Sequence, residues 1–82
     1  IISHLDVVPA GDLSLWNTDP WDVIEKDGKL FGRGVEDNQQ GLVSGVAACL
    51  AFFKNDVKPK HTVKLLFASD EEVGSKYGIF GF

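Results

Sequence analysis

Three groups of side chains that can do chemistry follow apolar or glycine-containing segments of this sequence. Imidazole and carboxylate groups are the ligand types of a hydrolytic zinc site. A carboxylate that stays uncoordinated beside such a site can act as a general base. The sequence therefore raises the hypothesis of metal-assisted hydrolysis, and its candidate residues fall in three short segments: His4-Leu5-Asp6, Glu36-Asp37 and Asp70-Glu71-Glu72.

The first group, His4-Leu5-Asp6, ends a predicted strand. Residues two apart in a strand point to the same face, so the imidazole of His4 and the carboxylate of Asp6 can be neighbours. A carboxylate beside a histidine fixes its tautomer and raises its basicity, as it does for metal-bound imidazoles. The alternative is a surface histidine and a strand-ending aspartate that meet only water.

The second group contains Asp37, which follows Gly32-Arg33-Gly34. A dinucleotide loop is disfavoured because Asp37 stands where the third glycine of that motif belongs, and its charge would repel a pyrophosphate. Two interpretations remain open. Asp37 can bind a metal ion, or it can cap the following helix, since Asp37 and Gln40 imitate a capping box.

The third group, Asp70-Glu71-Glu72, directly follows an apolar predicted strand. Three adjacent acids repel one another, and a divalent cation would relieve that repulsion. A solvated turn is the alternative. A site of two metal ions ~3.5–4 Å apart needs a bridging carboxylate and terminal ligands on each ion. His4, Asp37 and Glu72 could supply half of that set.

Two other residues with metal-binding side chains have simpler interpretations. His61 begins the last predicted strand, at the end opposite to Glu71, and we expect it to be exposed. Cys49 lies among apolar residues in the middle of the predicted helix, and we expect it to be a small core residue.

The elements that must position these groups are a strand, a hairpin, a helix and a second strand. The predicted ranges are Ile1–Val8 for the first strand, Trp21–Gly34 for the hairpin around Asp27-Gly28, Asn38–Asn55 for the helix with one broad apolar face, and Thr62–Ala68 for a strand buried on both sides. A helix between two strands predicts an α/β fold with a sheet covered by helices. In such folds ligands gather at the carboxyl ends of the strands, where all three groups fall.

The composition limits the class of protein. Eighty-two residues, 44% of them hydrophobic, predict one small compact domain rather than a disordered segment. A net charge of −4 without a basic cluster argues against nucleic acid and against a membrane surface as partners. The apolar run Gly41–Phe53 is shorter than the ~20 residues of a membrane span. One cysteine cannot form an intrachain disulfide, and the absence of methionine suggests a piece of a longer protein.

The motifs resemble those of a known enzyme family. His4-Leu5-Asp6-Val7-Val8-Pro9 resembles the first metal motif of the di-zinc metallopeptidases, which include carboxypeptidase G, aminoacylase, acetylornithine deacetylase, succinyl-diaminopimelate desuccinylase and the dipeptidases. The similarity extends over nearly the whole chain in the same order and spacing. It continues through Trp16, Asp19-Pro20-Trp21, Asp27 to Gly34, Asp37, and Glu71-Glu72 with Gly74.

The resemblance implies a role for each candidate residue. His4 would bind one metal ion, Asp37 would bridge two, and Glu72 would bind the other. Asp6 would orient His4, and Glu71 would be the general base. The cofactors would be two divalent ions, zinc or else cobalt or manganese. The family also tends to have a cis peptide bond after the bridging aspartate, here between Asp37 and Asn38.

The resemblance also implies what the complete protein would be. Residues 1–82 would form part of a zinc-peptidase-like catalytic domain, inactive alone, with the remaining ligands and a lid domain that often dimerises lying elsewhere. The complete protein would be a cytoplasmic hydrolase that cleaves the amide bond of a dipeptide or an N-acyl amino acid. The sequence departs from the family pattern at Asn38-Gln39-Gln40-Gly41, where the family commonly has Met or Asp, then Lys and Gly. This departure bears on the helix start and on substrate preference.

Two rival functions remain. A family member that has lost hydrolysis would bind metal, or an interaction partner, without catalysis. A glycosidase with Asp37 and Glu71 as its two carboxylates would leave the His4-Asp6 pair unexplained.

Overall fold

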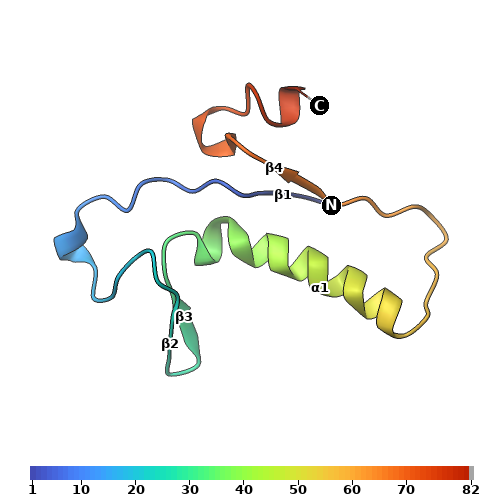
Figure 1. Cartoon of the computed structure of the whole chain (residues 1–82), viewed down its shortest axis with the longest axis horizontal. Coiled ribbons are helices and arrows are strands. Elements are labelled where there is room, and N and C mark those ends of the chain that lie inside the picture. The colour runs from blue at the N-terminus through green and yellow to red at the C-terminus, as the bar shows by residue number, and fades with distance from the viewer. Residues whose placement is uncertain (82) are drawn as a thin grey trace.

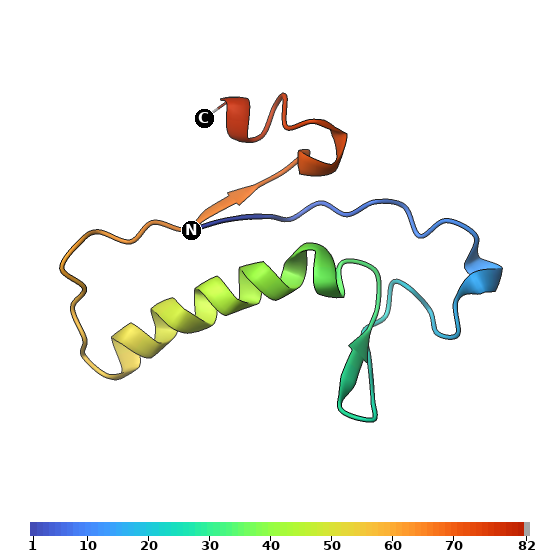
Figure 2. The same cartoon turned by 180° about the vertical axis from the view of Figure 1, so that it is seen from behind.

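The computed structural model describes residues 1–81, and its centre is a pair of parallel strands. Strand β1 (Ile2–His4) pairs with β4 (Leu66–Ala68), with His4 opposite Ala68. Helix α1 (Gly41–Lys54) lies on the other side of β1 from β4, as Figure 1 and the reverse view in Figure 2 show. The predicted order of strand, hairpin, helix and strand is confirmed, and the chain has the α/β character expected of it.

Both strands are shorter than the sequence predicts. The backbone pairing extends beyond the strands by one hydrogen bond at each end, 2.8 Å from Leu5 N to Ala68 O and 3.0 Å from Leu66 N to Ile1 O. Among the described residues each of these strands has only the other as a partner. The β-rich flanks at 6–8 and 62–65 therefore stay outside this pairing.

The predicted hairpin is present as β2 (Ile24–Lys26) and β3 (Lys29–Phe31), which pair in antiparallel fashion. Asp27 and Gly28 between them have φ angles of 53° and 71°. Two consecutive positive φ angles are the geometry of the tight turn that the Asp-Gly pair favours. The hairpin projects away from β1 and α1 (Figure 1).

The expectation of a compact domain is wrong for this chain. Its radius of gyration is 15.7 Å, and its extents are 49 × 36 × 11 Å. A compact domain of this length would have a radius of about 12 Å. The elements thus form a thin, open layer, because α1 and the β1–β4 pair lie side by side with no second layer over them among residues 1–81.

Burial within this layer departs from three predictions. In β4, Phe67 is 39% exposed, so this strand is not buried on both sides. In α1 only Gly45 is buried, whereas Leu50 and Phe53 on the predicted core face are exposed. Cys49 is half-buried rather than a core residue. One layer covers one side of each element, which is too little to enclose these side chains.

The longest helix of the structure is α1, with 14 residues. Within residues 1–81, no helix combines the length and apolar character that crossing a membrane requires.

Candidate metal centre

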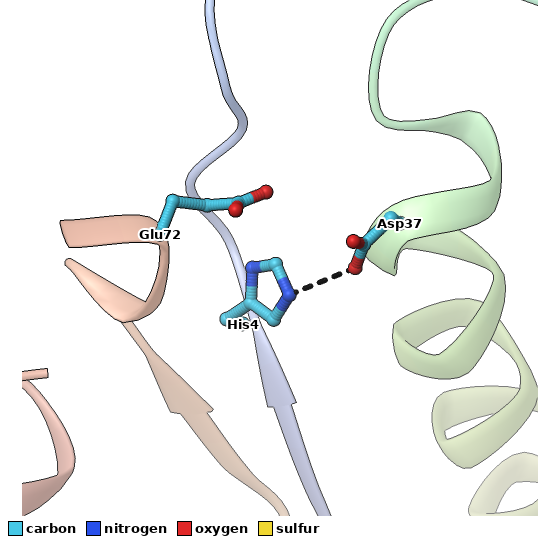
Figure 3. A group of neighbouring side chains, drawn as sticks. All are labelled: His4, Asp37 and Glu72. Atoms are coloured by element: carbon cyan, nitrogen blue, oxygen red, sulfur yellow. Dashed lines mark hydrogen bonds and ion pairs between the residues drawn. The ribbon is translucent and has the colours of Figure 1, made fainter. Parts of the chain in front are cut away.

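Three elements bring one histidine and two carboxylates together. His4 ends β1, Asp37 lies in the turn before α1, and Glu72 lies in a single 3-10 turn, Glu71–Val73, after β4 (Figure 3). One ligand atom from each of the three lies within 4.8 Å of the other two. The parallel pairing of His4 with Ala68 is responsible, because it sets the carboxyl ends of both strands at one edge.

The imidazole of His4 is held at both nitrogens. Its side chain is buried, with 6% of the residue exposed. Nδ1 lies 3.0 Å from the backbone carbonyl oxygen of Asp6, and Nε2 lies 3.0 Å from Oδ1 of Asp37. A carbonyl only accepts, so Nδ1 must carry a proton and donate it. The lone pair of a neutral His4 then lies on Nε2 and faces Asp37.

Nε2 of a neutral His4 and Oδ1 of Asp37 are both hydrogen-bond acceptors, so they cannot bond to each other directly. Either a proton on Nε2 or a cation between the two atoms makes the contact favourable. Burial lowers the pKa of His4, but hydrogen bonds to the Asp6 carbonyl and to Asp37, together with the negative charge of Glu71, raise it above its usual value overall. A divalent cation between Nε2 and the carboxylate oxygens would satisfy the same atoms. The donor set of one nitrogen and two carboxylates fits such an ion.

Asp6 connects His4 to the glutamate turn, which is the 3-10 turn Glu71–Val73. Its carboxylate Oδ2 accepts a hydrogen bond of 3.1 Å from the backbone N–H of Glu72. Its Oδ1 is 3.6 Å from Nδ1 of His4, so the direct hydrogen bond to the imidazole comes from the Asp6 backbone instead. Burial raises the pKa of Asp6, but the N–H groups of Glu72 and Glu71 lower it by more, which keeps the carboxylate charged.

Asp37 does not act as a helix cap. It and Asn38 leave helical geometry within the kinked segment Val35–Gln40, and the residue that precedes α1, Gln40, has no side-chain capping bond. The side chain of Asp37 is 75% exposed and points toward His4 (Figure 3). The peptide bond between Asp37 and Asn38 is cis, as the family resemblance implies.

Gly34 makes the approach to Asp37 feasible. Its φ angle is 83°, and its carbonyl accepts a 2.9 Å hydrogen bond from Gln39 N, which closes the turn around Asp37. A Cβ at this position would also overlap the side chain of Val7. The second glycine of Gly32-Arg33-Gly34 is therefore required by backbone conformation and by the close approach of β1's continuation.

Glu71 and Glu72 lie in the same turn in different surroundings. Glu72 contributes to the group with His4 and Asp37. The Glu71 carboxylate is 3.8 Å from Nε2 of His4, and its side chain is 52% exposed. It therefore stands beside the metal-binding group with access to solvent, the position that a proton carrier needs.

The other candidates lie apart from this cluster. Glu36 is exposed, and His61 is exposed in the segment between α1 and β4, as predicted. In the sequence Asp70 stands out only as one of three adjacent acids that repel one another. In the structure its carboxylate accepts two backbone hydrogen bonds. No pattern in the sequence predicts these two hydrogen bonds, because their donors, the backbone N–H groups of Tyr77 and Gly78, lie seven and eight residues further along the chain.

Residues 1–81 match the model of peptidase family M20/M25/M40. The chain belongs to this family. It is 53% identical over 79 residues to an uncharacterized metallohydrolase of Methanocaldococcus jannaschii. The matched region covers 96% of this chain and 19% of that protein. It is 42% identical over 78 residues to the succinyl-diaminopimelate desuccinylase of Rickettsia prowazekii, covering 94% of this chain and 20% of the relative.

The chain thus spans about a fifth of the length of these relatives. No solved structure matches it. The family membership confirms the resemblance inferred from the motifs, and it makes the cluster of His4, Asp37 and Glu72 a candidate divalent-metal centre.

Proposed function

We propose that this chain carries part of the active site of a metal-dependent amidohydrolase. Its substrate would be a dipeptide or an N-acyl amino acid, and its cofactors would be two divalent ions, with zinc favoured over cobalt or manganese. The observation that carries the proposal is the convergence of His4, Asp37 and Glu72 within 4.8 Å, with Glu71 beside them. The desuccinylase name of several relatives supports the N-acyl amino acid class.

We further propose that residues 1–82 are a partial catalytic domain. The large exposed apolar side chains of α1 and β4 support this, since a contiguous apolar surface normally meets another layer. The rest of the complete protein would supply that layer, the missing metal ligands and a lid domain. A cytoplasmic location and a homodimeric state belong to the same proposal.

The proposed roles follow from the positions of the side chains. His4 and Glu72 would each hold one ion, and Asp37 would lie between the two. Bound divalent ions acidify a water molecule and polarise the scissile carbonyl. Glu71 would accept the proton of the attacking water and deliver it to the departing amine nitrogen. Asp6 would fix the positions of both metal ligands. Its carboxylate accepts the backbone N–H of Glu72, and its carbonyl accepts the Nδ1–H of His4.

The test is hydrolysis by the complete protein with Glu71→Gln or Asp37→Ala. The substrate panel consists of dipeptides, N-acetyl amino acids and N-succinyl amino acids, each with the metal content measured. We expect Glu71→Gln to retain its metal and to lose activity by about 10²–10⁴-fold, the usual contribution of a general base. Asp37→Ala should lose both metal and activity. The exposed neighbour Glu36→Gln is the matched control.

Two outcomes would contradict this proposal. Hydrolysis unaffected by either substitution would exclude the assigned roles. Stoichiometric metal binding by the unsubstituted protein, with no hydrolysis of any substrate in the panel, would favour the non-catalytic member of the family instead.

A further inference from the structure

Asp70, the residue before the two glutamates, joins two segments of the chain. Its carboxylate Oδ2 accepts a 2.7 Å hydrogen bond from Tyr77 N, and Oδ1 accepts a 2.8 Å hydrogen bond from Gly78 N. Its own carbonyl accepts a 2.7 Å hydrogen bond from Ser75 N. Three backbone groups of the segment 75–78 are thus attached to the residue that links β4 to the Glu71–Val73 turn.

Gly78 provides a second, steric observation at the same place. A Cβ at this position would overlap the carbonyl oxygen of Ser69 and lie 2.6 Å from Oδ1 of Asp70. Only a residue without a side chain lets the segment 75–78 lie this close to the end of β4. The contact is therefore specified at both sides, by a carboxylate at 70 and by a glycine at 78.

The glutamate turn is consequently fixed from two directions. On one side the carboxylate of Asp6 accepts the N–H of Glu72. On the other side Asp70 has a φ angle of 61°, and its carboxylate fastens the segment that follows the turn. Charge-assisted bonds of this kind are stronger and shorter than neutral ones. Both restrict the directions in which the side chains of Glu71 and Glu72 can leave the backbone.

We propose that Asp70 is a positioning residue, which holds Glu72 toward His4 and Asp37, and Glu71 beside them, by binding the backbone at Tyr77 and Gly78. This inference rests on the proposed function. It assigns Asp70 no contact with metal or substrate. Groups that orient a metal ligand typically change metal affinity or activity by about 10–100-fold when they are removed.

The experiment compares Asp70→Asn and Gly78→Ala in the complete protein. Asparagine tolerates a positive φ as aspartate does, so Asp70→Asn leaves the backbone conformation accessible. It loses an acceptor and places an N–H₂ group against a backbone N–H. Gly78→Ala opens the same contact while the carboxylate stays. Asp12→Asn is the control, because Asp12 also accepts a backbone hydrogen bond, from Ser14 N at 2.9 Å, but in a distant loop.

The readout is the pair of zinc affinities, measured by competition with a chromogenic chelator, together with the thermal unfolding midpoint and kcat. The variants Glu72→Gln and His4→Gln serve as references. The zinc affinity that Glu72→Gln weakens is the Glu72-dependent one, and the affinity that His4→Gln weakens is the His4-dependent one. We expect Asp70→Asn and Gly78→Ala to weaken the Glu72-dependent affinity by about 10–100-fold. The His4-dependent affinity should change by less than about threefold, and Asp12→Asn should change neither.

Three results decide the matter. Two unchanged affinities in both Asp70→Asn and Gly78→Ala would overturn the inference. An equal loss of both affinities that follows a fall in the unfolding midpoint would also overturn it, because that is the behaviour of a general structural role. If Glu72→Gln and His4→Gln themselves leave zinc binding intact, the proposed function fails, independently of Asp70.

Discussion

The two ends of this thin molecule are built in opposite ways. The site end comprises the carboxyl ends of β1 and β4 and the kinked turn before α1. There the buried polar residues Ser3 and His4 lie, with hydrogen bonds linking His4, Asp6 and Glu72. The far end comprises the second half of α1 and the segment 55–63. It exposes large apolar side chains, with Phe53 82% exposed.

The far end also has a groove of about 280 Å³ lined mostly by apolar side chains, which include Cys49, Phe52, Phe53, Val57, Pro59 and Val63. The difference between the ends reflects two kinds of force. Hydrogen bonds are directional and need only the few partners that this chain contains. The hydrophobic effect depends on the total apolar area removed from water, and one layer removes little. The chain thus specifies the geometry of its site more completely than it stabilises its fold.

The strongest effect that we expect concerns the stability of residues 1–82 by themselves. Because no large side chain among the described residues is fully buried, we expect residues 1–82 by themselves to lack a cooperative thermal transition and to bind a hydrophobic dye. They should not hydrolyse any substrate that the complete protein accepts. Calorimetry and dye fluorescence on the isolated piece check this. A sharp, reversible unfolding transition would show that the far end does not need a covering layer.

The next effect concerns the site end, in the complete protein. We expect His4→Ala to reduce kcat/KM by about 10³-fold or more, since it removes a proposed metal ligand. His61→Ala, a change of the exposed histidine outside the cluster, should leave kcat/KM within about twofold. Steady-state kinetics and metal analysis measure both. Equal losses for the two variants would remove the distinction between the site end and the rest of the chain.

A smaller effect concerns the turn that carries Asp37. Gly34→Ala should lower the free energy of unfolding of the complete protein by about 2–4 kcal/mol, because a positive φ and an overlap with Val7 add together. Gly28→Ala also has a positive φ but has nothing within 4 Å of its added Cβ, so it should cost about 1–2 kcal/mol.

Chemical denaturation of both glycine variants gives the comparison. Gly34→Ala should also reduce activity, whereas Gly28→Ala should not, because only Gly34 shapes the segment that presents Asp37. A greater loss of stability for Gly28→Ala would indicate that the contact with Val7 contributes nothing.

Several features were predictable from local sequence. The Asp27-Gly28 turn needs only its own two residues to define the hairpin. The helix between two strands follows from apolar spacing. The alignment of His4 with the glutamate turn depends in addition on the parallel pairing of β1 with β4, which joins residues far apart in the sequence. Burial was not predictable in the same way. Phe67 and Leu50 have the pattern of core residues, but their exposure depends on whether another layer is present.

Residue types and short-range spacing are local properties, so the amino-acid sequence was sufficient to identify the groups that can do chemistry, their order, and the family to which the chain belongs. How those groups are used became clear from the folded chain. It showed that Asp37 faces His4 rather than capping α1, and that Asp6 holds Glu72 N–H with its carboxylate while its carbonyl holds His4. It also showed that Asp70 binds a segment seven residues away. These contacts depend on where separate backbone segments meet in space, which no spacing along the chain specifies.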